Sequence, residues 1–144
     1  MTEDYRMRLI DTNILVYAYD RSYLKKHKIA KEVVKTSWQT KSGVLSTQNL
    51  AEFYSIITRK VQKPIAISKA KQIILDLIEG FEILRYSEQT IVSAIDNQMI
   101  YGIPFWDSLI VATMEENSID TIITENEKDF KKVEWLNVIN PFKK

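Results

Sequence analysis

Short apolar segments alternate with helical stripes of apolar residues along most of the chain. The short segments have the length of buried strands and predict strands at 7–10, 44–46, 81–84, 121–124 and 137–139. Between them, apolar residues recur every three or four positions, which predicts helices at 13–19, 24–41, 47–61, between Ser68 and Gly80, between Ser87 and Gly102, and at 107–117. We expect the last strand at an edge of the sheet, because Pro141 follows it.

The predicted helix ends carry residues that suit those positions. Ser68 and Ser87 are predicted N-caps, since a serine side chain accepts a hydrogen bond from the free backbone N–H groups of the first turn. Gly80 and Gly102 stand where a helix ends with a left-handed residue, and Gly43 closes the helix at 24–41 or starts the next turn.

Strands that alternate with helices predict an α/β protein whose parallel sheet is covered by helices on both faces. The length of 144 residues is typical of one domain, and no internal repeat or linker divides the chain. We therefore expect a single domain over 1–144.

Composition and charge exclude few classes of function. The chain has no Cys and one His, and its formal net charge is +1. No apolar stretch approaches the ~20 residues that span a bilayer, so we expect a cytoplasmic protein without a membrane segment. A lysine-rich segment at 23–35 forms either a solvated helix face or a patch that contacts phosphate groups.

Several acidic residues lie where a ligand site of a parallel sheet is expected, beyond the carboxyl ends of the strands. Asp11 follows the first strand, Asp107 opens a helix, Glu52 lies one turn into a helix, and Asp129 follows the strand at 121–124. Each also has a purely structural interpretation. Asp11 and Asp107 suit N-caps, Glu52 suits an exposed helix position, and Asp129 suits a surface turn.

Asp11, Glu52 and Asp107 share a feature that favours a functional interpretation, since each lies at the margin of a buried element. Neighbouring carboxylates raise one another's pKa, so a cluster of them needs a cation. Mg²⁺ and Mn²⁺ prefer oxygen ligands, whereas a chain with no Cys and one His offers little for zinc.

At these residues the chain resembles the PIN-domain proteins, a family of small ribonucleases dependent on Mg²⁺ or Mn²⁺ that includes the VapC-type toxins of toxin–antitoxin pairs. The matching segments are "LIDTNILVYAYD", "STQNLAEFYSII", "PFWDSLIVATMEENSID" and "IITENEKDF", in family order. The resemblance covers essentially the whole chain. It implies a three-layer α/β/α sandwich with a central, mainly parallel sheet.

The resemblance also implies roles for particular residues. The catalytic and metal-binding acids would be Asp11, Glu52, Asp107 and Asp129, with Asn126 standing where many relatives carry an Asp. Polar residues that would support the acids by hydrogen bonds are Thr12, Asn13, Ser46, Thr124 and Asn126. Residues that would contact RNA phosphates are Lys25, Lys26, Lys28 and Arg59. Tyr17, Tyr19 and Trp106 would either stack on bases or pack in the core.

The function implied is an Mg²⁺- or Mn²⁺-dependent endoribonuclease, the toxin of a pair with a cognate antitoxin. The alternatives are a catalytically degenerate RNA-binding PIN module and a metal-dependent phosphohydrolase. A homodimer is also expected, through apolar surface at 53–61 or 73–78.

Overall fold

The computed structural model describes residues 6–143. Residues 1–5 and 144 of the predicted single domain lie outside this range. Among the described residues, no helix has both the length and the apolar character needed to cross a bilayer.

Five short strands form one sheet in the order β3-β2-β1-β4-β5, and every neighbouring pair is parallel. The strands are β1 (Arg8–Ile10), β2 (Gly43–Ser46), β3 (Glu82–Leu84), β4 (Thr121–Ile123) and β5 (Asn137–Ile139). The predicted parallel sheet is confirmed, with the last strand at one of its edges.

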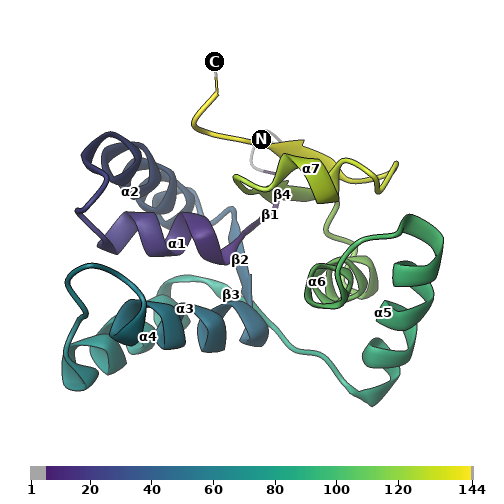
Figure 1. Ribbon diagram of the computed structural model, residues 1–144, viewed down its shortest axis with the longest axis horizontal. Helices are drawn as coiled ribbons and strands as arrows, with labels where there is room; N and C mark the ends of the chain where they lie inside the picture. Colours follow the sequence, from purple (N-terminus) through teal and green to yellow (C-terminus); the bar gives the residue numbers. More distant parts are fainter. Residues whose placement is uncertain (1–5, 144) are drawn as a thin grey trace.

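The helices lie on both sides of this sheet, as Figure 1 shows, with α1 to α4 on one side and α5 and α6 on the other. They are α1 (Thr12–Tyr19), α2 (Leu24–Gln39), α3 (Thr47–Arg59), α4 (Ile67–Gly80), α5 (Glu88–Tyr101), α6 (Phe105–Glu116) and α7 (Glu127–Phe130). This arrangement confirms the predicted three-layer α/β/α sandwich.

Adjacent residues of each central strand enter different cores, because successive side chains of a strand point to opposite faces. Ile10, Leu45 and Ile123 pack against α1 to α4. Their neighbours Leu9, Val44 and Ile122 pack against α6 on the opposite face. The central strands are therefore buried on both faces, and their carboxyl ends provide positions for polar groups.

Some predicted helix ends are confirmed and others are wrong. Ser87 is the N-cap of α5, and Gly102 ends that helix with a left-handed φ of 66°. Ser68 is not a cap, because α4 begins after Ala66, and Gly80 is the last helical residue instead of a left-handed one. Asp107 is not a cap either, since α6 begins after Pro104 and places Asp107 in its first turn.

Gly43 neither closes α2 nor turns the chain, because it is the first residue of β2. The left-handed position after α2 is taken by Lys41, with a φ of 56°. A Cβ atom on Gly43 would overlap the Phe81 ring. Gly43 is therefore required by the close approach of Phe81 to the start of β2.

Of the apolar surface predicted for a homodimer at 53–61, Phe53 and Ile57 are buried in the core of a single chain, whereas Tyr54, Ile56 and Val61 are partly exposed. At 73–78, Ile73 and Leu77 are buried, and Leu75 and Ile78 are exposed. A larger exposed apolar stripe lies on α5, at Ile91, Val92, Ile95, Met99 and Ile100. The homodimer itself stays a prediction.

Replacing Gly43 by Ala should lower the free energy of unfolding by about 1–3 kcal/mol, because the added methyl group overpacks the contact with Phe81. The measurement is urea denaturation of both proteins. In a Phe81→Leu background the same substitution should cost less, since the smaller side chain leaves room. Equal costs in the two backgrounds would contradict the assigned contact.

Candidate functional site

Asp11 occupies the carboxyl end of β1 and is also the N-cap of α1, so its predicted capping role is confirmed. Its Oδ1 accepts a hydrogen bond from the Thr12 N–H at 2.9 Å, and its Oδ2 accepts one from the Thr124 hydroxyl at 2.7 Å. Asn13 donates a longer bond to Oδ2, at 3.4 Å. The side chain is only 9% exposed, so these donors replace water around its charge.

Glu52 is positioned by polar residues from α1 and from the start of α3. The Thr12 hydroxyl donates to its Oε1 at 2.9 Å, and Gln48 donates to its Oε2 at 3.3 Å. Asn49 in turn donates to the Thr12 hydroxyl at 3.0 Å. Ser46, the N-cap of α3, bonds the Asn49 side chain at 2.8 Å, which fixes its orientation.

Asn126 connects the two remaining acids. Its side-chain amide donates to Asp107 at 3.2 Å and to Asp129 at 3.3 Å. Its backbone N–H donates to the Thr124 hydroxyl at 2.9 Å, and that hydroxyl is the donor to Asp11. Asn126 is also the N-cap of the short helix α7, which places Asp129 in the first turn. The predicted acids and supporting residues thus form one connected cluster.

The charges of these acids act on one another. Burial is the largest cause that raises the pKa of the Asp107 carboxyl to about 6, followed by the charges of Asp11, Asp129 and Glu52. Burial also raises the pKa of Asp11, and the charge of Glu52 adds to that effect. Among residues 6–143, no Lys, Arg or His forms an ion pair with any of the four acids.

The donor set suits a hard divalent cation, because it offers carboxylate oxygens that no cationic side chain within residues 6–143 pairs with. Asp11, Glu52, Asp107 and Asp129 are the residues that would hold such an ion. Within the described part of the chain, however, no three His, Cys, Asp or Glu side chains are already grouped closely enough to hold a metal. Hydroxyl and amide groups stand between the carboxylates in this arrangement.

Two residues of the cluster were missed by sequence analysis, namely Gln48 and Asn49. Both are buried, and Gln48 also donates to the backbone oxygen of Trp106 at 3.0 Å, which ties α3 to α6. Their signal was available in the sequence as amides near the start of an apolar helix. It was not specific, because amides are equally common on solvated surfaces.

Lys26, predicted to contact RNA, forms an ion pair with Glu125 beside the acid cluster. The Tyr17 hydroxyl donates to the same carboxylate at 3.0 Å, and the Glu125 N–H donates to the Asn13 side chain at 3.3 Å. Lys26 therefore lies at the edge of the site, but its charge is already partnered.

The other predicted RNA contacts are spread over the surface. Lys25 and Lys28 are exposed near the start of α2, and Arg59 is exposed at the end of α3. Trp106 is 58% exposed next to Asp107, whereas Tyr19 packs edge-on against Phe53 with ring centroids 5.5 Å apart. Contact with RNA stays a prediction for all of them.

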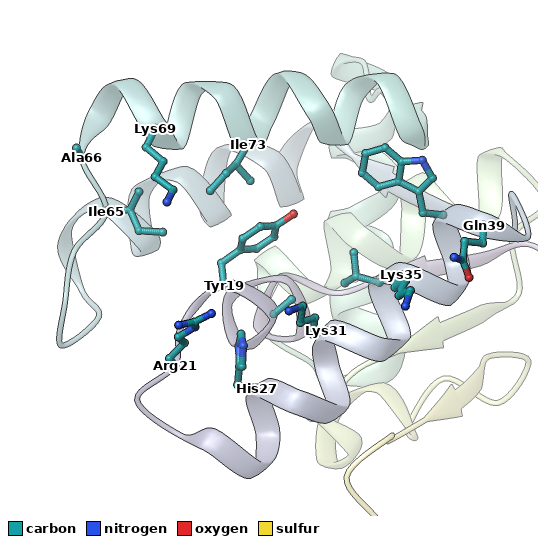
Figure 2. Close-up of a pocket in the computed structure, with 13 residues that line it drawn as sticks. Tyr19, Arg21, His27, Lys31, Lys35, Gln39, Ile65, Ala66, Lys69 and Ile73 are labelled. Carbon is teal, nitrogen blue, oxygen red and sulfur yellow. The ribbon is translucent and has the colours of Figure 1, made fainter.

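A cavity of about 830 Å³, which we call the larger cavity, lies away from the acids, between α2 and α4. Figure 2 shows Tyr19 and Ile73 pointing into it from α1 and α4. Cationic side chains surround this apolar interior, namely those of Arg21, Lys31, Lys35 and Lys69. The cavity therefore combines apolar walls with a positive rim.

The fold and the acids together define a class, the small α/β proteins that gather carboxylates at the carboxyl ends of a parallel sheet. Residues 8–136 match the family model of the PIN domain, and the chain therefore belongs to the PIN domain family. A comparison with curated proteins finds no match.

Solved structures of toxin–antitoxin proteins are similar to this chain in fold. A toxin–antitoxin complex from Klebsiella pneumoniae matches with a TM-score of 0.70 and 20% identity, over 95% of this chain and 99% of that one. VapBC2 from Rickettsia felis, bound to a promoter DNA fragment, matches with a TM-score of 0.65 and 22% identity, over 93% and 98%. VapC20 from Mycobacterium tuberculosis, a sarcin–ricin loop cleaving toxin, matches with a TM-score of 0.67 and 13% identity, over 88% and 95%.

The raised pKa of Asp107 should make stability fall as pH rises from about 4 to about 6 in the absence of metal. Folded Asp107 keeps its proton up to about pH 6, whereas the ordinary value is 3.8, so the folded chain binds more protons in this range. Asp107→Asn should flatten this fall and be more stable than the wild type at pH 7. Urea denaturation in EDTA at several pH values measures both effects, and identical pH profiles would contradict the assignment.

Proposed function

We propose that the chain is a divalent-metal-dependent endoribonuclease that acts as the toxin of a toxin–antitoxin pair. The observation that carries this proposal is the cluster of Asp11, Glu52, Asp107 and Asp129. The charges of the other three acids raise the pKa of Asp107, and among residues 6–143 no Lys, Arg or His forms an ion pair with any of the four. Such a set is suited to a hard cation and, through it, to a phosphodiester.

Two comparisons support the proposal. The chain belongs to the PIN domain family, and its structural neighbours include toxin–antitoxin complexes from Klebsiella pneumoniae and Rickettsia felis. VapC20 from Mycobacterium tuberculosis, which shares the fold, cleaves the sarcin–ricin loop, an RNA element. RNA is therefore the substrate class we assign to this chain.

The residues around the acids would orient them for this chemistry. Thr124 and the Thr12 N–H hold the Asp11 carboxylate, Thr12 and Gln48 hold Glu52, and Asn126 holds Asp107 and Asp129. A bound divalent ion supplies a water that ionises near neutral pH and stabilises charge on the phosphate. These hydrogen bonds restrict the orientations of the carboxylates, which would reduce the rearrangement needed when an ion and a phosphate bind.

We also propose that the cavity between α2 and α4 binds an acidic, partly apolar segment of the antitoxin. Its apolar walls at Tyr19 and Ile73 suit buried aliphatic side chains, and the exposed amines of Lys31, Lys35 and Lys69 suit carboxylates around them. The cavity does not include the acid cluster, so this contact and substrate binding use different surfaces.

Asp11→Asn and Asp107→Asn should each reduce Mg²⁺-dependent RNA cleavage by at least about 100-fold. Loss of groups that merely orient metal ligands already costs 10- to 100-fold, and these substitutions remove ligand charges themselves. The measurement is cleavage of total RNA at matched metal concentration, together with calorimetric titration of Mn²⁺. Asp96→Asn, an exposed acid on α5, is the matched control and should behave as the wild type.

Two results would contradict this proposal. Full cleavage by either variant would exclude the assigned acids. Weak Mn²⁺ binding by a wild-type chain that binds RNA without cleaving it would indicate the catalytically degenerate module instead.

Lys35→Glu at the rim of the larger cavity should weaken antitoxin binding without changing cleavage, because it reverses a charge that faces the partner. In cells, co-expression of the cognate antitoxin should restore growth with the wild type and fail to do so with Lys35→Glu. Lys128→Glu, exposed on α7, is the control. Equal rescue of the two variants would place the antitoxin elsewhere.

A further inference from the structure

A second, smaller cavity lies beside the acid site, between α1 and the C-terminal part of α3. Its volume is about 300 Å³, at the lower end of the range for small-molecule sites. Asn13, which bonds Asp11, stands at one end of it, and Asp20 and Lys60 line it farther along. From Asn13 to Asp20 the axis of α1 advances about 10 Å, which is long enough for one or two nucleotides.

The spacing of residues along α3 relates this cavity to the acid cluster. On α3, Glu52 and Ile56 are spaced by four residues and share a face, and Lys60, the C-cap of the helix, follows after four more residues. Ile56 and Lys60 line the cavity, and Glu52 belongs to the acid cluster. The cavity and the acid cluster therefore lie along the same face of α3.

Asp20 gives the cavity a specific hydrogen-bonding group. Its side chain is only 9% exposed, and its Oδ1 accepts the Ser22 N–H at 3.0 Å. Within residues 6–143, no hydrogen-bond donor is paired with its Oδ2, and no Lys, Arg or His forms an ion pair with it. This oxygen is accessible in the lining of the cavity, so it can accept hydrogen bonds from a ligand that brings N–H donors.

Aromatic and cationic groups complete the cavity. Tyr17 and Tyr23 line it with ring centroids 6.1 Å apart in an edge-to-face arrangement, and Tyr23 is 55% exposed. An exposed tyrosine ring is a surface on which an unpaired base can stack. The Lys60 amine, exposed at the end of α3, is available to a phosphate.

We propose that this cavity binds a guanine base of single-stranded RNA, one or two nucleotides from the cleaved bond. Guanine is the one standard base whose Watson–Crick edge presents two adjacent donors, N1–H and the N2 amine, to a carboxylate. Cytosine and adenine present one amine beside an acceptor, which Asp20 would repel. The proposal rests on the proposed function for its choice of RNA, but base binding can be measured without cleavage.

The test uses NMR titration to measure how tightly nucleoside monophosphates bind to the full chain in EDTA. GMP should bind at least about fivefold more tightly than AMP, a discrimination expected for a two-donor contact to a base edge. IMP, which lacks the N2 amine, should bind between the two. Asp96→Asn, the exposed acid on α5, is the matched control and should keep the wild-type order.

Asp20→Asn provides a readout that a merely structural role would not produce. Its amide can donate to the O2 atom of xanthine, so this variant should lose the preference for GMP and bind XMP more tightly than GMP. Tyr23→Leu should weaken GMP and AMP alike, because it removes the stacking surface and leaves Asp20 in place. Tyr23→Leu also keeps the proposal testable if Asp20→Asn fails to fold.

The outcomes separate this proposal from the proposed function. Equal affinities of the wild type for GMP and AMP, or an unchanged order of affinities in Asp20→Asn, would overturn the guanine site. If the wild type cleaves RNA at positions unrelated to guanine, the guanine site is wrong and the nuclease stands. If GMP binds as expected and RNA is not cleaved in Mg²⁺, the nuclease is wrong and the guanine site stands.

Discussion

The parallel pairing of β1 with β4 is the constraint on which the acid site depends. Their register sets Ile10 beside Ile123, and the Asp11 N–H then donates to the Ile123 oxygen at 2.9 Å. Thr124, the next residue, reaches Asp11 with its hydroxyl at 2.7 Å. A slip of one residue would turn each strand's side chains to the opposite face, so the two cores and this bond would be lost together.

Around this pair, the chain holds several carboxylates near one another by placing hydroxyl and amide donors between them. Thr12, Thr124 and Asn126 each bond at least one acid. These bonds offset part of the repulsion, and the remainder is visible in the raised pKa of Asp107. Ionised Asp107 therefore costs the folded chain some stability, as is common for groups held at a binding site.

Much of this architecture could be predicted from the sequence, because it follows from local patterns. The strand before Asp11 and the stripe around Phe53 are short-range signals, and both are confirmed. Other features depend on contacts between distant segments. The overlap that requires Gly43 and the bridging role of Gln48 each involve a neighbour that is far away in the sequence. The ligand roles of the acids remain predictions, because the structure shows that the acids are neighbours and does not test what they bind.

The acids come from positions 11, 52, 107 and 129, which span most of the chain. During synthesis, therefore, the cluster cannot assemble until β4 and α7 have emerged from the ribosome, because Thr124 and Asn126 complete its hydrogen bonds. The helices that line the larger cavity, α2 and α4, emerge earlier. A nascent chain could thus present that cavity to a partner protein before its acid cluster exists.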